Sequence, residues 1–359
     1  MATAKQNANE SKKSFSTQVA EKLIKQLEDG VAPWQRPWGD SKNAQLPMNP
    51  TSGKRYKGIN VVHLLSEGRT DPRWMTYKQA EAAGAQVRKG EKGTTIQFWS
   101  FPEKVSPSDL SPENVDVKAK SSIPFVRYSS VFNAEQIDGL PPLPVAKAAT
   151  WESIERAERL LMSSGAQIDH ASQNRALYYP KSDRILLPLK EQFADSHLYY
   201  SVALHELGHW TGHESRLNRD LQGAMGGERY AVEELRAEIS SMLMGAEIGL
   251  GHDPSNHVAY VAHWIAELKK DPAIIFKAAA DAEKIQLFLL QKELEFTNKT
   301  KLSQHLPATA IPEPHSPAIK TMANNSYITP YQFGKETNSV LLSKTPSKAS
   351  LKKPAGIRL

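Results

Sequence analysis

The sequence predicts an α+β protein: a small α+β N-terminal domain, then a mostly helical C-terminal domain with a small sheet. Helical periodicity alternates with short β-branched and aromatic runs up to about residue 137. A proline-dense stretch at 138–144 separates this part from longer helical patterns, and from residue 301 onward Pro, Ser, Thr and Lys recur without periodicity. We therefore expect a disordered segment at 1–13, domains at 14–147 and 148–299, and a flexible basic tail at 300–359.

The first domain is expected to open with a helix from about Thr17 to Asp29, because apolar residues recur there at helical spacing. Ser16 could cap this helix, and Gly30 ends it. Residues 33–38, PWQRPW, follow as an extended stretch, since proline disfavours helix. Beyond them the patterns predict short helices at 60–65 and 75–83, and strands at 94–101 and 125–132 flanking a polar loop.

The second domain is expected to open with a helix at 151–163, followed by a hairpin built from residues 176–179 and 184–187 around a Pro-Lys-Ser-Asp turn. The remainder is helical. The strand at 184–188 is the expected free edge, which could pair with an extended peptide.

The composition of the chain limits the kinds of metal site and binding partner that it can have. The chain has no cysteine, so a metal site must use histidine, carboxylate and water. Segment 1–147 has 21 basic and 15 acidic residues, 148–299 has 16 and 22, and 300–359 has 8 and 2. Polyanion binding is therefore expected at the flanks. No apolar run approaches the roughly 18 to 20 residues that span a bilayer, and no signal peptide is evident, so we expect a cytoplasmic protein without membrane contact.

The run HELGH at residues 205–209 predicts a metal site. His205 and His209 are four residues apart, so on a helix their imidazoles lie about 6 Å apart on one face and can bind one ion. Glu206 lies beside them and is expected to act as the general base, taking a proton from the attacking water and delivering it to the leaving amine. Tyr260 and His263 could donate hydrogen bonds to the oxyanion, although residues of these types belong more often to the core.

A third ligand is expected on the acidic helix that contains residues 233–238. Glu234 and Glu238 are one turn apart, so one can bind the metal while the other orients a ligating histidine. We assign Glu234 as the ligand and Glu238 as its support, although the reverse assignment stays open. The expected cofactor is one Zn²⁺ ion, with Mn²⁺ or Co²⁺ as alternatives.

Aromatic and basic residues are interleaved in the first domain. Aromatic faces can stack on bases while lysine and arginine meet phosphates, and stacking is tolerant of sequence. The alternative is that two or more of these aromatic residues form the core of a small domain. The expected DNA-binding residues are Trp34, Arg36, Trp38, Lys54, Arg55, Lys57, Trp74, Tyr77, Lys78, Arg88, Lys89 and Lys92.

Several separate motifs, in order along the chain, resemble the ArdC-like antirestriction proteins and the N-terminal part of plasmid TraC-type primases. They are GVAPW with PW at 30–38, YKGIN at 56–60, WMTYKQA at 74–80, VRKGEKG at 87–93, VFN at 131–133 with QI at 136–137, the 205–213 motif with RL at 216–217, and the 233–238 helix.

This resemblance implies an N-terminal domain that binds single-stranded DNA and a C-terminal zincin-like metallopeptidase domain, typically encoded on mobile elements. It also implies protection of incoming plasmid DNA from restriction during conjugation. The chain departs from the family's patterns at two points. Glu238 stands where zincins with a glutamate ligand usually have aspartate, and no large catalytic region follows the second domain, so primase activity is not expected.

The leading hypothesis is a DNA-binding protein whose peptidase domain cleaves an unknown protein substrate on or near DNA. An alternative is a DNA-coating protein with a silent or structural metal site. The presence of Glu206 favours retained chemistry, because a structural site does not need a general base. A third reading, a metallopeptidase whose basic end binds acidic partners, is disfavoured by the interleaved aromatic residues.

Overall fold

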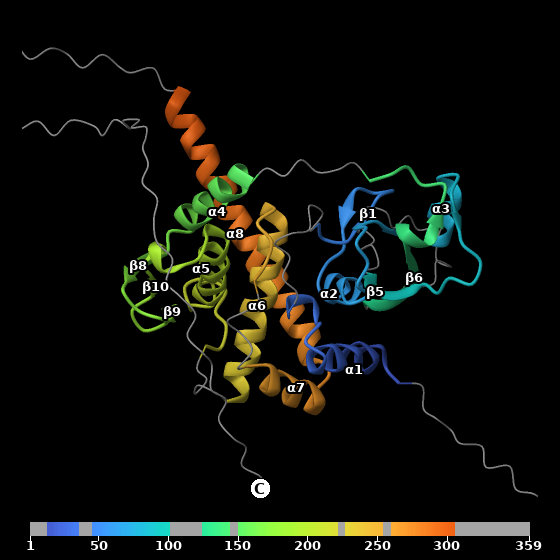
Figure 1. Ribbon diagram of the computed structural model, residues 1–359, viewed down its shortest axis with the longest axis horizontal. Coiled ribbons are helices and arrows are strands. Elements are labelled where there is room, and N and C mark those ends of the chain that lie inside the picture. The colour runs from blue at the N-terminus through green and yellow to red at the C-terminus, as the bar shows by residue number, and fades with distance from the viewer. Residues whose placement is uncertain are drawn as a thin grey trace, which may run out of the picture. The chain divides into compact units, whose positions relative to one another are not determined.

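The computed structural model describes residues 13–35, 45–100, 124–143, 150–221, 227–253 and 260–305 (Figure 1). The expected disordered segment 1–13 lies outside these residues except for its last residue. No helix in the described ranges is long and apolar enough to cross a membrane.

The N-terminal part mixes short helices with small sheets, as predicted. A three-stranded sheet has the order β3-β6-β5, and two-stranded pairs are formed by β1 with β2 and by β4 with β7. The elements are α1 (Phe15–Glu28), η1 (Pro33–Gln35), β1 (Met48–Asn49), β2 (Lys54–Arg55), α2 (Ile59–Leu65), β3 (Trp74–Met75), α3 (Tyr77–Ala82), β4 (Gln86–Val87), β5 (Thr94–Ser100), β6 (Phe125–Asn133), η3 (Ala134–Gln136) and β7 (Ile137–Asp138).

The C-terminal part is mostly helical and carries one three-stranded sheet of order β8-β10-β9. This sheet packs beside α5 (Figure 1). The elements are α4 (Thr150–Ser164), β8 (Gln167–Ala171), β9 (Leu177–Tyr179), β10 (Arg184–Pro188), η4 (Lys190–Gln192), α5 (Ser196–Trp210), α6 (Glu228–Ile248), α7 (Val261–Lys270) and α8 (Ile274–His305).

Two local predictions need correction. The side chain of Ser14, not Ser16, caps α1, because it accepts a hydrogen bond from the backbone N–H of Thr17. The predicted helix at 75–83 is shorter, since residues 74–75 form strand β3 and Thr76 caps α3 together with Gln79. Strand β3 ends at Met75 and helix α3 starts after its cap, Thr76. The periodicity of apolar residues does not locate a boundary to within one residue.

The predicted edge strand is also wrong. Strand β10 pairs in parallel with β8 and antiparallel with β9, so it lies in the centre of its sheet. Strand β8, which the sequence did not predict, occupies one side, and β9 forms an outer strand next to α5. The outer edges of this sheet therefore belong to β8 and β9, not to β10.

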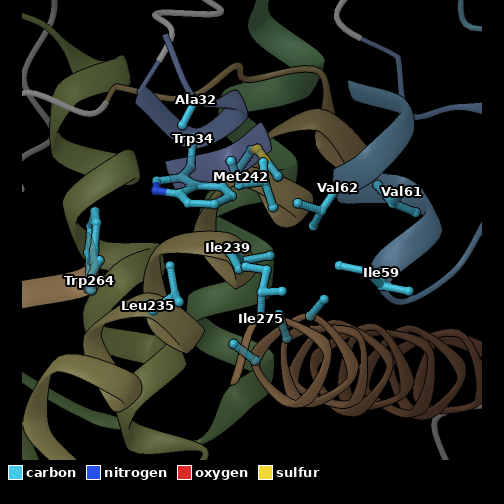
Figure 2. Packing of buried hydrophobic residues seen from close by; sticks show 14 of the residues in the cluster. Ala32, Trp34, Ile59, Val61, Val62, Leu235, Ile239, Met242, Trp264 and Ile275 are labelled. Carbon is cyan, nitrogen blue, oxygen red and sulfur yellow. The ribbon is translucent and has the colours of Figure 1, made fainter. Parts of the chain in front are cut away.

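One hydrophobic cluster crosses the predicted domain boundary (Figure 2). It joins Trp34 of η1 and Val62 of α2 to Ile239 of α6, Trp264 of α7 and Ile275 of α8. The described residues up to 305 belong to one compact unit. The boundary predicted near residue 147 lies outside the described residues, and the division into domains at 14–147 and 148–299 stays a prediction.

A second cluster positions the predicted metal site. It packs α4, α5 and the β10 sheet against α6 and α8, around buried residues that include Leu160, Ile185, Leu204 and Leu207. Helix α8 continues past residue 300 to His305, into the segment predicted as a flexible tail. The rest of that segment lies outside the described residues.

Candidate metal centre

Helix α5 presents the HELGH motif from within the protein. Asp195 caps its N-terminus by accepting the backbone N–H of Leu198 at 2.9 Å. Gly208 allows α5 to approach α6 closely, because a Cβ at this position would lie 2.8 Å from Ser240 Oγ. His205 and Glu206 are buried at this point of α5, and His209 is partly buried.

Three potential ligand atoms converge between α5 and α6. The Nε2 atoms of His205 and His209 lie 3.1 Å apart. Glu234 places Oε2 3.3 Å from Nε2 of His205 and Oε1 3.5 Å from Nε2 of His209. Among the described residues, this trio is the group of histidine and acidic side chains that could hold a metal ion.

The donor set fits a divalent cation. Zinc–nitrogen and zinc–oxygen bonds are about 2.0–2.2 Å long, so neighbouring ligand atoms in a tetrahedral site lie about 3.3 Å apart. The observed separations of 3.1, 3.3 and 3.5 Å bracket that spacing. Two imidazole nitrogens and one carboxylate leave a further coordination position, as in catalytic rather than structural zinc sites.

Two further carboxylates hold the histidines from behind. Glu238 Oε2 lies 3.3 Å from Nδ1 of His205, and Glu233 Oε1 lies 3.3 Å from Nδ1 of His209. Such contacts fix the tautomer and the ring orientation of a metal-binding histidine. Arg219 pairs in turn with Glu233 at 2.7 Å and donates to the carbonyl oxygen of Gly208 at 2.7 Å.

A buried histidine extends the contact made by Glu238. His252 Nε2 lies 3.0 Å from Glu238 Oε1 and 3.0 Å from the backbone oxygen of Trp34. Three parts of the chain therefore meet on the Nδ1 side of His205: Glu238 of α6, His252 after α6, and the backbone of Trp34. His252 is far from the motif in sequence, and no spacing rule would have identified it.

The buried carboxylates and imidazoles of the site shift one another's pKa values. Burial disfavours the charged imidazolium of His209, but Glu234 and Glu233 outweigh it and raise the pKa to about 9. The pKa of His205 is also raised, because Glu234 and Glu238 outweigh the burial of its ring. Burial works against ionisation of Glu234, yet the charges of His209 and His205 hold the pKa of its carboxyl well below the usual range. Burial raises the pKa of Glu206.

The trio opens into a cavity of about 760 Å³. Glu206 lines it and receives a backbone hydrogen bond from Tyr178 of strand β9, so the outer strand runs beside the predicted base. Tyr230 and Tyr260 also line the cavity, with their hydroxyls 3.2 Å apart. His263, the other candidate for an oxyanion donor, is exposed and does not line the cavity.

Comparison with known proteins identifies the family. Residues 155–281 match the family described as zincin-like metallopeptidase, and residues 13–132 match the N-terminal domain of anti-restriction factor ArdC. The metal-free crystal structure of the antirestriction ArdC protein from plasmid R388 is 34% identical to this chain, with a TM-score of 0.63. That comparison covers 79% of this chain and 99% of the R388 protein. The chain belongs to the ArdC family.

Other members and relatives agree with this assignment. The Mn(II)-bound structure of the R388 ArdC protein also has a TM-score of 0.63. Protein y4eC of Sinorhizobium fredii, described as uncharacterized, is 36% identical over 273 residues, which cover 74% of this chain and 88% of y4eC. The resemblance inferred from the sequence motifs is thus confirmed.

The TraC primases are much longer proteins. Two Escherichia coli proteins named DNA primase TraC are 57% identical over 293 residues and 55% identical over 299 residues. These alignments cover 79% and 80% of this chain but only 20% and 28% of the primases. The chain therefore spans less than a third of the length of these relatives.

Within the part that matches the ArdC N-terminal domain, two of the predicted base-stacking residues are corrected by the structure. Trp34 is 0% exposed and packs edge-to-face on Trp264, and Trp74 is 2% exposed. Their indoles join the hydrophobic clusters, so neither ring offers a free face to a base. Tyr77 is exposed, as expected. Arg36 and Trp38 lie outside the described residues.

The predicted phosphate-binding residues of this ArdC-type region divide into two groups. Lys54, Lys78, Lys89 and Lys92 are exposed. The others are exposed as well but pair with carboxylates, as Arg55 does with Glu247, Lys57 with Glu283, and Arg88 with Glu91 and Asp138. Arg55 and Lys57 thus contact helices α6 and α8; α6 lies within the residues that match the zincin-like metallopeptidase family, whereas Glu283 of α8 lies just beyond them.

Sequence reasoning missed several residues of the metal centre. Glu233 was visible as a neighbour of Glu234, and its position one residue earlier on the helix turns it toward the other side of His209. Arg219 and His252 carry no spacing signal, because the segments before and after α6 bring them to the site. Tyr230 lies one turn before Glu234 on α6, and its hydroxyl meets that of Tyr260.

Proposed function

We propose that this protein is an antirestriction-type factor that binds single-stranded DNA and carries a zinc-dependent metallopeptidase site. It would protect incoming mobile-element DNA and cleave proteins on or near that DNA. The observation that carries the proposal is the convergence of His205, His209 and Glu234 beside Glu206 in a cavity bordered by a strand edge. The cytoplasmic location expected from the sequence stays a prediction.

The proposed ligands are Nε2 of His205, Nε2 of His209 and a carboxylate oxygen of Glu234. Their separations support this assignment over the reverse one, in which Glu238 would be the ligand, because Glu238 contacts Nδ1 of His205. Zinc is the proposed cation on the basis of the donor set, and the Mn(II)-bound R388 relative makes manganese the first alternative. When bound, the cation would polarise the scissile carbonyl and lower the pKa of water.

Glu206 is the proposed general base. Burial raises the pKa of its carboxyl, which brings it closer to neutral pH, where proton transfer in both directions is efficient. It would take a proton from water as the water oxygen bonds to the peptide carbon, and deliver that proton to the amine nitrogen as the C–N bond breaks. Tyr260 lines the same cavity and is placed to donate a hydrogen bond to the carbonyl oxygen.

Strand β9 is the proposed docking site for the peptide backbone. It forms an outer strand of its sheet, and the backbone of Tyr178 already contacts Glu206. An extended substrate that pairs with β9 would bring its carbonyl groups next to the base and the metal ligands. Backbone pairing recognises an extended conformation rather than a sequence, which suits a substrate in an exposed or unfolded segment.

DNA binding is proposed from the family match and from the exposed basic residues of the N-terminal part. The R388 relative is described as an antirestriction protein. Lys54, Lys78, Lys89 and Lys92 are exposed and can meet phosphates, which supports this assignment.

The test compares wild type with Glu206→Gln and with Glu214→Gln, a matched change of an exposed carboxylate near the motif. Each protein is titrated with fluorescent single-stranded and duplex oligonucleotides across a salt series. Proteolysis is measured by gel on fluorescent casein and on a restriction endonuclease, with and without single-stranded DNA. Protection is measured as the transfer efficiency of an unmodified plasmid into restricting and non-restricting hosts.

We expect all three proteins to prefer single strands, and only Glu206→Gln to lose cleavage. If Glu206→Gln protects plasmid transfer as well as wild type, protection comes from coating DNA and the metal site is silent or structural. Equal binding of single-stranded and duplex DNA by wild type would refute the DNA-binding assignment, whatever the peptidase result.

A further inference from the structure

The hairpin formed by β5 and β6 carries four large aromatic side chains that are not buried. Phe98 is 44% exposed, Trp99 58%, Phe125 43% and Tyr128 57%. At the other end of the same hairpin, Ile96 and Val131 are buried in a hydrophobic cluster. The exposed rings are therefore not part of the domain core. This is unusual, because an aromatic side chain normally buries about 150–250 Å² when the protein folds.

Strand register divides the rings between the two faces of the hairpin. Phe98 of β5 stands opposite Arg127 of β6. Ser100, two residues after Phe98, stands opposite Phe125. Cross-strand partners share a face, so Phe98, Phe125 and Arg127 lie together. The Arg127 guanidinium lies 4.9 Å from the centre of the Phe125 ring.

The opposite face carries the other two rings. Trp99 stands opposite Val126, and Tyr128 stands opposite Gln97. On each face the two aromatic residues are therefore diagonal neighbours, a relationship in which backbone positions lie about 7–8 Å apart. Phe15 of α1 meets Tyr128 edge-to-face at 5.6 Å between ring centres, which fixes the tyrosine without covering it.

Charge on the hairpin suits a polyanion. Residues 94–100 and 125–133 contain no aspartate or glutamate, and Arg127 is their one formally charged side chain. Stacking platforms for single-stranded nucleic acid combine exposed aromatic faces with cations that track the phosphates.

We propose that this hairpin surface, made of Phe98, Trp99, Phe125, Arg127 and Tyr128, binds single-stranded DNA by stacking bases on its rings. The inference rests on the proposed DNA binding and assigns the place where it occurs. It replaces Trp34 and Trp74, whose indoles are buried.

The test uses the full chain with Trp99→Leu, Tyr128→Leu and the double variant, which keep apolar area but remove the rings. Trp99→Phe keeps a ring, and Phe296→Ala removes an exposed aromatic ring from α8 as a matched control. Binding of fluorescein-labelled oligo-dT is followed by anisotropy at fixed salt. Thermal unfolding verifies that each variant is folded, and sedimentation reports its oligomeric state.

Wild type, Trp99→Phe and Phe296→Ala should bind alike, each leucine variant should lose on the order of tenfold in affinity, and the double variant should lose more. Wild-type tryptophan fluorescence should be quenched by oligo-dT, and the quench should shrink in Trp99→Phe although binding persists. If wild type binds oligo-dT and the leucine variants bind equally well, the hairpin assignment is wrong while the proposed function stands.

Two other outcomes would also overturn the inference. No binding of oligo-dT by wild type removes the proposed DNA-binding function itself, and the hairpin assignment with it. A wild-type dimer that becomes monomeric in the leucine variants, with unchanged DNA affinity, would show that the rings join two copies of the chain.

Discussion

Glu238 Oε2 lies 3.3 Å from Nδ1 of His205, while Glu234 Oε2 lies 3.3 Å from Nε2 of the same ring. One imidazole therefore separates two carboxylates that sit one turn apart on α6. The carboxylate at Nε2 also reaches His209, and the carboxylate at Nδ1 reaches His252. This arrangement gives the two glutamates different tasks, which mutagenesis can separate.

We expect Glu234→Gln to weaken metal binding more than Glu238→Gln does. Loss of an anionic ligand removes a bond to the cation, whereas loss of a supporting contact typically costs about 10- to 100-fold in affinity. Competition with a fluorescent chelator for Zn²⁺ and for Mn²⁺ measures both. A larger loss in Glu238→Gln would reverse the ligand assignment.

The metal affinity should rise with pH through the neutral range. At pH 7 His209, with a pKa of about 9, holds a proton that the cation must displace, and the raised pKa of His205 acts in the same direction. Apparent affinity should therefore increase by about tenfold per pH unit for each displaced proton until pH approaches 9. The stability of the metal-free protein should change with pH in the opposite direction. A histidine pKa that is raised in the folded state stabilises the fold below the ordinary histidine pKa, and this contribution is lost as pH rises through 9.

Isothermal titration of the metal at pH 6.5, 7.5 and 8.5, in buffers with different ionisation enthalpies, counts the protons released. Release of no proton at pH 6.5 and 7.5 would show that the histidines are already neutral in the metal-free protein.

Arg219→Met should destabilise the metal-free protein by about 3 kcal/mol. The substitution leaves the buried Glu233 carboxylate without its closest partner, and breaking one side of a buried ion pair is costly. Arg236 still contacts Glu233 at 3.4 Å, so the loss should stay at the low end of the range for such pairs. Chemical unfolding in EDTA measures it, with Arg229→Met, which removes an exposed pair with Asp220, as the control. Equal effects of the two changes would contradict a structural role for Arg219.

Trp34→Ala should cost about 3–5 kcal/mol in stability, as is typical when a buried aromatic side chain is truncated. The indole packs on Trp264 within a cluster that also contains α2, α6 and α8. Trp34→Phe should retain most of the stability and should bind single-stranded DNA like wild type. A folded Trp34→Phe protein with strongly weakened DNA binding would restore the stacking role that the sequence suggested.

By itself, the sequence determined the chemistry of the metal site and most of the elements that carry it. His205, Glu206 and His209 could be placed on one helix because four residues make about one helical turn. Strands β5 and β6 and helices α1, α2 and α4 were predicted within about two residues, since each has its own periodic pattern. The family could be recognised because its motifs occur in order along the chain.

Only the tertiary structure decided which groups meet. Glu234 and Glu238 lie one turn apart on the same helix, so the sequence does not distinguish their roles. The crossing of α5 and α6 sets which nitrogen of His205 each one faces. Trp34 looks like an exposed aromatic residue between prolines, yet α6 and α7 bury it. The rings of Phe98 and Trp99 look like ordinary strand residues in the sequence, yet they are exposed, although α1 contacts the neighbouring Tyr128 and α2 contacts Gln97. Burial and partner choice depend on contacts between segments far apart in the chain, and local periodicity contains no information about them.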